Sequence, residues 1–288
     1  QGIAERGADV INIGQVPVDA VYFAVGRYHY RGGIMITASH NPKEYNGLKM
    51  VKEGVFVIRG EEILRHFEQK NTTKIRNRPK GRVIKKDIWS DYLKHVLSFI
   101  EAAKIKPFKV VIDASNAMAG IAIPKLKDKL PIQIIPINFK LNGKNPAHSF
   151  NPLEKRSLEK ISKTIRKFRA DMGFIFDGDG DRIFLLDEKS NLVRSDISLL
   201  LLAKCFLKKN PGARIVYNII CSRAVPELIK KFQGKPVRSA VGFVNIKENL
   251  IKHKALMGGE FSGHFSFRDN FNSDSGIIAF LILLEIIR

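Results

Sequence analysis

The alternation of strand-like and helix-like segments from Lys109 onward is the feature that most constrains the fold of this chain. Between Lys109 and Phe176 three strand-like segments are separated by two helix-like ones, and the same plan recurs between Arg214 and Met257. Strands that alternate with helices form mostly parallel sheets with helices on both faces. The sequence therefore predicts an α/β protein in which one plan occurs twice.

The expected elements follow from apolar periodicity and from turn residues. In the first unit we expect strands at Lys109–Ala114, Ile132–Ile137 and Met172–Phe176, and helices near Ala119–Leu130 and at Leu153–Phe168. In the second we expect helices at Asp196–Lys208, Ala224–Phe232 and Asn245–His253, and strands at Arg214–Ile220, Pro236–Ser239 and Ala255–Met257. A helix from Ile88 to about Ala103 precedes these units, and a last helix begins at Asp274. The polar break Asp187–Asn191 predicts a domain boundary near Asn191.

The N-terminal part is expected to contain shorter elements. They are strands at Val10–Ile13, Ile34–Thr37 and Val55–Ile58, and helices at Val18–Val25 and Glu61–Gln69. The stretch Asn71–Lys86 then holds seven basic residues, no acidic one, and both Pro79 and Gly81. This composition is typical of a solvated linker. The same stretch is the best nucleic-acid candidate in the chain, but it contains no aromatic residue for base stacking, so we favour the linker.

Composition limits the class of protein and its partners. The 288 residues suffice for about two domains. The 49 Lys and Arg against 28 Asp and Glu give a net charge of +21, which suits nucleic acid, an anionic membrane surface or a phosphorylated substrate, or reflects an organism-wide habit. Two cysteines form no disulfide framework, which indicates a reducing, cytoplasmic compartment. The apolar run Gly276–Leu284 is too short for a membrane span.

The stretch Ile34–Lys49 carries the first candidate reactive group. Its apolar run Ile34–Thr37 leads through Ala38 into Ser-His-Asn-Pro, which cannot continue a central strand. The exit from a strand into a loop is where α/β enzymes hold reactive groups, because the strand fixes the position and the loop gives access. Ser39 is therefore a candidate nucleophile. A hydrophilic surface turn is the alternative that these residues leave open.

The hexamer Asp177–Arg182 carries three carboxylates at alternate positions, separated by glycines. Such carboxylates repel one another unless they converge on a hard divalent cation. An EF-hand calcium loop shares this beginning, but its sixth position is glycine where this chain has Arg182, and the flanking segments are strand-like. A metal loop at a strand end therefore fits better, with a solvated acidic turn as the alternative.

The stretch Leu256–Phe267 offers a third polar set: Glu260, Ser262 and His264. These residues alternate, so in an extended loop they would share one face. A carboxylate beside a hydroxyl can bind two adjacent sugar hydroxyls as acceptor and donor. On its own this set is a weak indication, and a histidine in such a loop more often supports its neighbours by hydrogen bonding.

Taken together, these motifs resemble the phosphoserine, metal and sugar loops of the alpha-D-phosphohexomutases, and most of all the phosphomannomutase/phosphoglucomutase group. The residues that carry the resemblance are Thr37–Pro42 with Tyr45–Lys49, Asp177–Arg182, and Gly258–His264. They occur in the family's order across nearly the whole chain.

For the fold, the resemblance implies tandem α/β/α sandwich domains with mixed, mostly parallel sheets, within a family of four-domain, heart-shaped proteins. Residues 1–87 would form the first domain, without its beginning and with the basic linker. Residues 88–191 would form the second domain with the metal loop, and residues 192–288 the third with the sugar loop.

For the activity, the resemblance implies interconversion of hexose 1-phosphate and hexose 6-phosphate, the hexose being mannose or glucose. Ser39 would carry a phosphoryl group and transfer it to the sugar phosphate. The resulting glucose or mannose 1,6-bisphosphate, an intermediate and activator, would turn around and return the other phosphoryl group to Ser39.

The resemblance also assigns roles to side chains. Mg²⁺ would be held by Asp177, Asp179, Asp181 and an oxygen of phospho-Ser39. By position, His40 and Lys49 are candidates for proton handling or phosphate neutralisation, and Arg182 for holding the phosphoryl oxygens. The loop Glu260, Ser262, Gly263 and His264 would bind the sugar hydroxyls, with His264 supporting the loop.

The chain departs from the family pattern at both ends. The family's opening Gly-Thr-Ser-Gly-Ile-Arg-Gly-like segment and its fourth, phosphate-clamping domain are missing between Gln1 and Arg288. We therefore expect a fragment, and because both losses fall on phosphate binding, an inactive one. Where Phe243 and Ile220 stand, some relatives place His and Lys, so these two are not carried over as ligands. Lys247 and Arg223 remain candidate anion contacts.

Two alternatives to the mannose or glucose enzyme stay open. One is a phosphoglucosamine mutase, whose serine and sugar loops resemble these. The other is a catalytically silent, basic relative that binds nucleic acid through Asn71–Lys86, although we do not expect nucleic acid to be the partner. The residues select neither the preferred sugar nor an oligomeric state.

Overall fold

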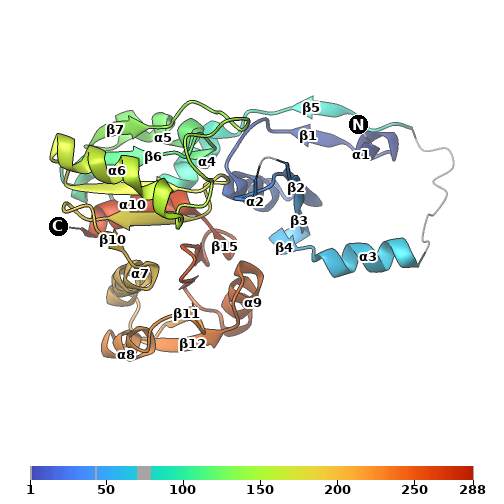
Figure 1. Cartoon of the computed structure of the whole chain (residues 1–288). Helices are drawn as coiled ribbons and strands as arrows, with labels where there is room; N and C mark the ends of the chain where they lie inside the picture. The colour runs from blue at the N-terminus through green and yellow to red at the C-terminus, as the bar shows by residue number, and fades with distance from the viewer. Residues whose placement is uncertain (1, 43, 70–78, 288) are drawn as a thin grey trace.

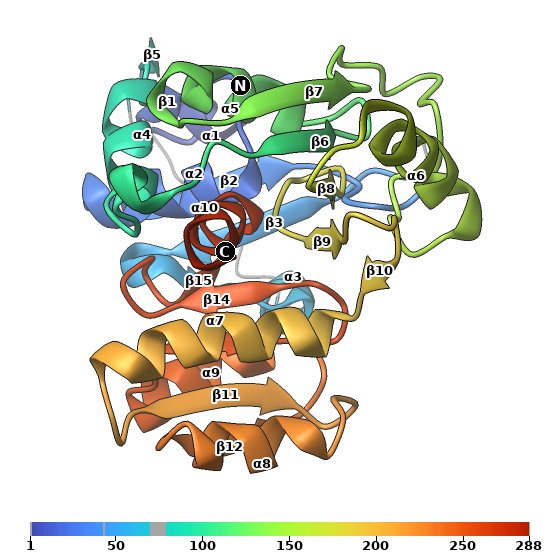
Figure 2. The same cartoon turned by 90° about the vertical axis from the view of Figure 1, so that its left-hand side faces the viewer.

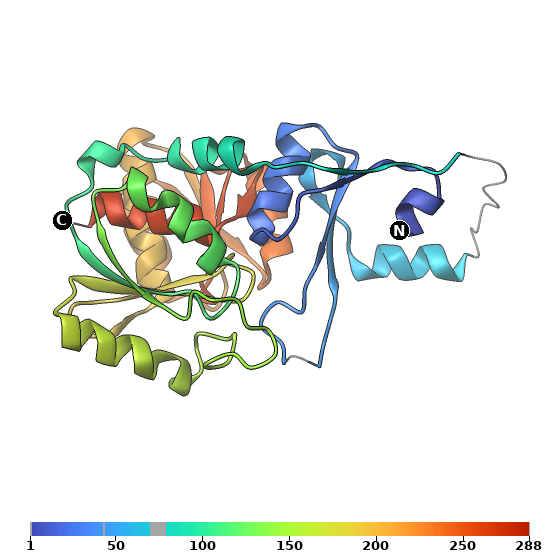
Figure 3. The same cartoon turned by 90° about the horizontal axis from the view of Figure 1, so that it is seen from above.

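The computed structural model describes residues 2–42, 44–69 and 79–287. Two layered units lie next to each other, and the N-terminal part extends away from them as an arm (Figure 1; Figure 3 shows the same arrangement from above). Among the described residues, no helix has both the length and the apolar character needed to cross a membrane.

The N-terminal part is built around a small antiparallel sheet. Its strands β2 (Gly32–Ile36), β3 (Leu48–Lys52) and β4 (Phe56–Val57) pair in the order β2-β3-β4. Helix α2 (Val18–Arg27) packs on this sheet, with Val18, Val25 and Val51 in one apolar cluster. The other elements are α1 (Gly2–Glu5), β1 (Val10–Asn12), the 3-10 turn Glu53–Val55, α3 (Gly60–Glu68) and β5 (Val83–Lys85). The Ser39 loop therefore joins two neighbouring antiparallel strands, β2 and β3.

The predicted basic linker is only partly described. Residues 70–78 lie outside the described residues, so the candidate basic side chains there have no structural account. Val83–Lys85, in contrast, form β5, which pairs in parallel with β1. These three residues are exposed, as predicted for a solvated stretch, but they form a strand where we expected a linker, because an apolar Val-Ile pair gave too weak a strand signal among so many charges.

The second unit contains α4 (Trp89–Leu97), β6 (Lys109–Asp113), α5 (Ala119–Leu126), β7 (Gln133–Ile137), α6 (Lys155–Phe168), β8 (Met172–Phe176), β9 (Ile183–Leu186) and β10 (Leu192–Val193). Short 3-10 turns, Ala102–Lys104 and Lys127–Lys129, follow α4 and α5. Its described strands form a five-stranded sheet in the order β10-β9-β8-β6-β7. Ile161 and Ile165 of α6 cover one face of this sheet.

The third unit repeats the plan. It contains α7 (Ser195–Lys209), β11 (Arg214–Asn218), α8 (Ala224–Lys231), β12 (Lys235–Ser239), α9 (Phe243–His253), β13 (Met257–Gly259), β14 (Phe265–Phe267), β15 (Ser273–Asp274) and α10 (Gly276–Ile286). The described strands pair in the order β12-β11-β13-β14-β15. Figure 2 shows this unit below the second one, with β14 and α7 between α10 and β11.

The prediction of tandem α/β units with mixed sheets is confirmed. In the described part of each five-stranded sheet, two strand pairs are parallel and two are antiparallel, so parallel pairing accounts for half of each sheet. The turn Asp187–Asn191, expected as a domain boundary, joins β9 to β10. Since β10 completes the second sheet, we place the boundary after Val193.

Helix α10 joins the second and third units through apolar packing. Its residues Gly276–Leu284 are all buried, which explains why the sequence is apolar on every side of this helix. Phe280 meets Phe174 and Phe176 of the second sheet edge to face, with ring centroids 5.0 and 6.0 Å apart. The expected start at Asp274 is close to the observed one: Ser275 caps the helix by accepting a hydrogen bond from the Ile278 amide at 3.0 Å.

A buried carboxyl group links all three units. Asp19 on α2 is 1% exposed, and its Oδ2 accepts hydrogen bonds from Tyr92 on α4 at 2.8 Å and from Ser275 before α10. Its Oδ1 has no partner among the described residues. Burial raises the pKa of Asp19 to about 7, against the opposing effect of the two hydroxyl donors.

Asp19→Ala is expected to lower the free energy of unfolding by roughly 2–4 kcal/mol, because both buried hydroxyls lose their acceptor. Urea denaturation measures this loss. The control is Asp128→Ala, which removes an exposed carboxylate and should change stability by less than about 0.5 kcal/mol. Equal effects of the two variants would contradict the assigned role.

The pH dependence of stability provides a second test of Asp19. A carboxyl group whose pKa is raised by folding stabilises the fold below its ordinary pKa, and this contribution is lost as pH rises from about 4 towards about 7. Asp19→Asn keeps an acceptor oxygen but cannot ionise. We therefore expect Asp19→Asn to become more stable relative to the parent protein across this range. A constant difference between pH 4 and pH 8 would show that the parent carboxyl group titrates normally.

Candidate functional site

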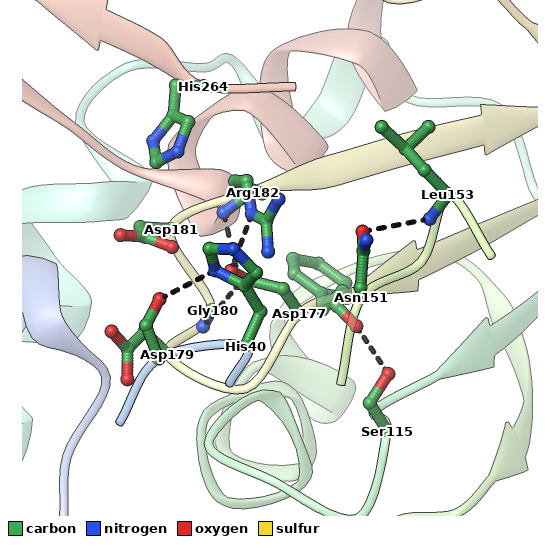
Figure 4. Close-up of polar contacts among 12 residues, drawn as sticks. His40, Ser115, Asn151, Leu153, Asp177, Asp179, Gly180, Asp181, Arg182 and His264 are labelled. Carbon is green, nitrogen blue, oxygen red and sulfur yellow. Dashed lines mark hydrogen bonds and ion pairs between the residues drawn. The ribbon is translucent and has the colours of Figure 1, made fainter. Parts of the chain in front are cut away.

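The three carboxylates of the predicted metal loop are buried where β8 ends and before β9 begins. Asp177, Asp179 and Asp181 are all at most 2% exposed, although the loop joins two strands at the boundary between the units. Figure 4 shows these carboxylates with Arg182 and His40 facing one another, and His264 beside Asp181. Because unpaired buried carboxylates are costly, the groups that compensate their charge define the site.

Lys49 supplies the first compensating charge. Its Nζ lies 2.6 Å from Asp179 Oδ2 and 2.7 Å from Asp181 Oδ2. Burial opposes the charge of Lys49, but the two carboxylates raise its pKa well above the ordinary value. Burial alone would also raise the pKa of Asp181, yet the Lys49 ammonium and His264 hold it below its usual range. The strand β3, which was not predicted, thus delivers a lysine into the carboxylate loop.

Arg182 supplies the second compensating charge. Its Nε donates to Asp177 Oδ2 at 2.8 Å, and the amides of Gly180 and Arg182 donate to Asp177 Oδ1 at 3.0 and 3.2 Å. Burial and the charge of Asp181 nevertheless raise the pKa of Asp177 to about 7. Arg182 Nη2 is buried without a hydrogen-bond partner among the described residues, so this guanidinium retains a donor for an anion.

Ser39 lies in the loop after β2, next to the carboxylate loop. Its Oγ is 3.2 Å from His40 Nδ1, and its amide donates to Thr37 Oγ1 at 2.8 Å. The Thr37 hydroxyl in turn donates to Asp179 Oδ1 at 2.5 Å. Ser39 has φ of 56°, a left-handed conformation that is uncommon for a serine. The serine is therefore tied to the carboxylate loop through Thr37.

His40 is suited to accept a proton near neutral pH. Burial, followed by the nearby Arg182 charge, lowers the pKa of His40 below its ordinary value. A neutral imidazole within hydrogen-bond reach of a hydroxyl is the arrangement that general-base catalysis requires.

The predicted sugar loop is the turn between β13 and β14. The Glu260 amide donates to the His264 carbonyl at 2.9 Å, the Gly263 amide donates to the Glu260 carbonyl at 3.1 Å, and Gly263 has φ of 88°. We expected an extended loop in which Glu260, Ser262 and His264 share one face. That expectation is wrong, because Gly263 takes a backbone conformation that closes a tight turn. Ser262 is half-buried in this turn.

Glu260 and His264 are held by different partners. Glu260 is 2% exposed, and its Oε1 accepts from the Gly242 amide at 2.7 Å and from Asn218 Nδ2 at 3.1 Å. His264 Nδ1 lies 2.7 Å from Asp274 Oδ2. Burial lowers the pKa of His264, but Asp181 and Asp274 outweigh burial and raise it. Both side chains are thus fixed before any sugar binds.

The turn and the carboxylate loop are bonded to each other. The Ile183 amide donates to the Gly263 carbonyl at 3.1 Å, and Arg182 and His264 form an antiparallel bridge. The structure therefore brings Ser39, Lys49, Arg182 and His264 to the carboxylate loop from all three units. The two candidate anion contacts lie elsewhere: Arg223 forms an exposed pair with Glu227 at 3.6 Å, and Lys247 donates to the Phe271 carbonyl and to Ser273 Oγ. The structure adds Thr37 and Asp274, which link Ser39 and His264 to the carboxylate loop; Thr37 stood inside the quoted motif, whereas no local pattern distinguishes Asp274.

A divalent cation fits this set of donors. Lys49 Nζ lies between two carboxylates, as a cation would, and Asp181 Oδ1 is buried without a partner among the described residues. Among the described His, Cys, Asp and Glu residues, the group whose ligand atoms lie within 4.8 Å of one another is Asp181, His264 and Asp274, which includes Asp181 of the predicted ligands but neither Asp177 nor Asp179. Carboxylate oxygens are the ligands that Mg²⁺ prefers.

Comparison with known families agrees with this geometry. Three models of phosphoglucomutase/phosphomannomutase match consecutive parts of the chain: alpha/beta/alpha domain I at residues 1–74, domain II at 90–190 and domain III at 194–288. The chain belongs to the alpha-D-phosphohexomutase superfamily.

Individual phosphohexomutases give the same result. A phosphomannomutase of Vibrio cholerae is 37% identical over 294 residues, which cover 99% of this chain and 63% of that protein. A phosphomannomutase/phosphoglucomutase of Pseudomonas syringae is 35% identical over 100% of this chain and 61% of its own length. A solved phosphoglucomutase/phosphomannomutase family structure from Burkholderia thailandensis has a TM-score of 0.91 at 29% identity, over 99% of this chain and 63% of that one. The chain thus spans 61% to 63% of the length of these two curated relatives.

Replacing Lys49 should expose the cost of the buried carboxylates. Without added metal, Lys49→Met is expected to lower the free energy of unfolding by about 3–5 kcal/mol, because Asp179 and Asp181 lose their cation. Lys52→Met, three residues along the same strand, removes only an exposed ion pair with Glu62 and should cost less than about 1 kcal/mol. Urea denaturation compares the two variants, and similar losses would contradict the analysis.

Gly178 tests how closely the serine and carboxylate loops approach. A Cβ atom at Gly178 would lie 2.5 Å from the Ser39 carbonyl oxygen, which belongs to the backbone. Gly178→Ala should therefore displace the Ser39 loop and change its amide NMR shifts, whereas Gly143→Ala, with no atom within 4 Å of its Cβ, should leave them in place. Unchanged Ser39 and His40 signals in Gly178→Ala would refute the close contact.

Proposed function

We propose that the protein to which this chain contributes interconverts hexose 1-phosphate and hexose 6-phosphate through a phosphorylated Ser39. The observation that supports this most directly is the linkage of Ser39 through Thr37 to the buried Asp179. Phosphoryl transfer demands positioning and charge stabilisation more than covalent chemistry. A serine fixed beside buried carboxylates and two cationic side chains meets that demand.

Ser39, Asp177, Asp179 and Asp181 would hold Mg²⁺, which would neutralise charge on the transferring phosphoryl group. Lys49 would then give up its contacts with the two carboxylates and become available to a phosphoryl oxygen or to a proton. Arg182 retains the unpartnered buried donor described above, which suits a phosphoryl oxygen. Lys49 and Arg182 would thus be the two cationic side chains next to the phosphoryl group on Ser39.

His40 would handle the proton. As a sugar hydroxyl attacks the phosphorus atom, its O–P bond forms and the bond from phosphorus to Ser39 Oγ breaks, so the sugar hydroxyl loses a proton and Ser39 Oγ gains one. The neutral imidazole of His40, 3.2 Å from Ser39 Oγ, would accept the proton of the Ser39 hydroxyl when Ser39 attacks the bisphosphate, and the imidazolium would return it to Oγ when the phosphoryl group leaves. The proton of the attacking sugar hydroxyl would pass to water, and water would protonate the departing sugar oxygen in the other half of the cycle.

Glu260, Ser262, Gly263 and His264 would bind the sugar. The Glu260 carboxylate and the Ser262 hydroxyl can accept from and donate to neighbouring hydroxyls, and both mannose and glucose offer such pairs. We therefore propose mannose or glucose phosphate as substrate, with the matching 1,6-bisphosphate as intermediate. Phosphomannomutases among the relatives favour this choice over glucosamine phosphate.

The nucleic-acid alternative gains no support from the described end of the basic stretch. Arg82 pairs with Asp9 at 3.2 Å, and Lys86 lies 3.5 Å from the ring centroid of Tyr28.

Cys205 and Cys221 are both free. The cytoplasmic location inferred from the cysteines stays a prediction, as do the domain limits and the oligomeric state.

Ser39→Ala in the full-length protein is expected to lower mutase turnover by at least about thousandfold, because the phosphoryl carrier is lost. EDTA should abolish turnover of the parent protein, and added Mg²⁺ should restore it. Turnover is measured with mannose 1-phosphate, glucose 1-phosphate and glucosamine 1-phosphate as separate substrates.

Two controls accompany this experiment. Ser98→Ala changes an exposed serine at the end of α4 and should retain parental turnover. Intact-mass analysis should find one phosphate on the parent protein and on Ser98→Ala, and none on Ser39→Ala. A Ser39→Ala variant that turns over normally would refute the mechanism, and selective turnover of glucosamine phosphate would refute the proposed sugar.

A further inference from the structure

The loop 138–154, between β7 and α6, is anchored to the turn that follows β6. Asn116 in that turn donates from Nδ2 to the Lys140 carbonyl at 2.8 Å. Its Oδ1 accepts from the Ala147 amide at 3.0 Å, and its carbonyl accepts from the Asn142 amide at 3.0 Å. Asn116 has φ of 56°, a left-handed conformation that Asn tolerates better than most residues. One residue therefore holds three points of the loop, two of them through its side chain.

A second anchor is the buried pair of Asp113 and His148. The Asp113 carboxylate at the end of β6 is fully buried, and accepts from the Ser115 amide at 2.9 Å and from Asn138 Nδ2 at 3.0 Å. His148 Nε2 lies 3.2 Å from Asp113 Oδ2. His148 Nδ1 lies 2.7 Å from the Ser149 carbonyl oxygen.

These contacts determine the protonation state of His148. A neutral imidazole has one nitrogen that donates and one that accepts. Here both ring nitrogens face acceptors, because a carbonyl oxygen cannot donate and the Asp113 carboxylate already accepts other N–H groups. Only the imidazolium, which donates from both nitrogens, satisfies both contacts. Since its side chain is 4% exposed, water cannot substitute for either partner.

The charged groups around the imidazole agree with this assignment. Burial lowers the pKa of His148, but the hydrogen bond and charge of Asp113 on β6 outweigh burial and raise it. Lys160 on α6 opposes the charge, yet its ammonium group is bonded to Asn138 Oδ1 at 2.9 Å. The other charged neighbour, Glu154, accepts a hydrogen bond from the Ser149 hydroxyl, with 2.8 Å between Ser149 Oγ and Glu154 Oε1.

The far side of this loop faces Ser39. Leu141, Gly143 and Phe150 line a cavity of about 370 Å³ together with Thr37 and Ser39. A second cavity of about 510 Å³ is lined by Pro146 and Glu154 of the loop and by His40 and Asn41. A Cβ atom at Gly178 would lie 3.6 Å from the Phe150 ring and 2.5 Å from the Ser39 carbonyl oxygen. The loop is therefore the wall that bounds the Ser39 loop on the side of the second unit.

We propose that His148 is a positioning residue: as an imidazolium bonded to Asp113 and Ser149, it fixes loop 138–154 as the far wall of the cavity beside Ser39. That this cavity receives the sugar phosphate rests on the proposed function. The anchoring of the loop by a charged histidine does not depend on it.

The direction of the pH effect follows from the contacts. Folding raises the pKa of His148 above its ordinary value of 6.5, so the anchor contributes fully below that pH and is lost as pH rises through the raised value. Once His148 loses a proton, one ring nitrogen presents a lone pair to an oxygen acceptor. The loop should therefore open more often at alkaline pH.

Long-range ¹H–¹⁵N NMR of the full-length protein tests the assignment directly. At pH 6.5 both ring nitrogens of His148 should show imidazolium shifts while an exposed histidine is partly neutral; His148→Gln identifies the signals. A single neutral tautomer at this pH would overturn the proposal.

Hydrogen exchange tests the anchoring. The amides of Asn142 and Ala147, both bonded to Asn116, should exchange about tenfold faster in His148→Gln than in the parent protein. The matched control His66→Gln, at an exposed position on α3, should exchange like the parent. In the parent the same amides should exchange faster, relative to the intrinsic rate, at pH 9 than at pH 6.5. Unchanged protection in His148→Gln would overturn the anchoring role.

The KM for the sugar phosphate tests the role of the wall. His148→Gln should raise the KM for mannose 1-phosphate several-fold relative to His66→Gln, because the wall of the cavity beside Ser39 is no longer fixed. Equal KM values, with the loop opened, would overturn the role of the wall. If even the parent protein shows no turnover, the proposed function fails, whereas the NMR and exchange results still decide the anchor.

Discussion

The burial of three carboxylates in one short loop is the constraint on which the rest of this structure depends. Asp177, Asp179 and Asp181 are almost fully removed from water, and a buried carboxylate without a cation or strong donors costs several kcal/mol. Lys49 and Arg182 provide the cations. The strand β3 must therefore lie where its lysine reaches into a loop more than a hundred residues away in the sequence.

The same loop holds the three units together. The Val18 amide of α2 donates to the Asp179 carbonyl at 3.2 Å, the Met118 amide donates to the Gly178 carbonyl at 3.3 Å, and the Ile183 amide reaches the Gly263 carbonyl. Asp19, one residue after Val18, binds hydroxyl groups from α4 and from the start of α10. Polar contacts thus set the relative positions of the units, while the apolar helix α10 supplies packing between the second and the third.

This division of roles suits the proposed phosphoryl transfer. Transition-state stabilisation by fixed charges requires that the charges do not move when the substrate binds. Asp177, Glu260 and His264 are each held by hydrogen bonds within the protein. Lys49, bound to two carboxylates where a metal ion would also bind, is the group whose contacts must change. In the proposed cycle, metal binding and the release of Lys49 are therefore one event.

The loop 138–154 shows a different use of buried charge. Asp113 and His148 take no part in the proposed chemistry, yet they bury an ion pair to fix an irregular segment of chain. A loop of this length has few backbone partners of its own, so side chains such as Asn116 and His148 must provide them. The wall beside Ser39 is thus built from the second unit, not from the unit that carries the serine.

The amino-acid sequence by itself predicted most of the elements and the stretches of the candidate site. The alternation of strands and helices predicted the repeated α/β plan, and the Ser39, Asp177–Arg182 and Gly258–His264 stretches indicated the site, because propensity, turn chemistry and short-range spacing are local properties. It missed β3, in which two of five residues are lysines, and the three-residue β14, and it expected an extended sugar loop where the left-handed Gly263 closes a turn. Only the tertiary structure decided which distant partners meet: Lys49 with Asp179 and Asp181, Asp19 with Tyr92 and Ser275, and His148 with Asp113. Those pairings depend on how sheets and helices pack and on the free energy of burying charge, and no local pattern in the chain encodes either quantity.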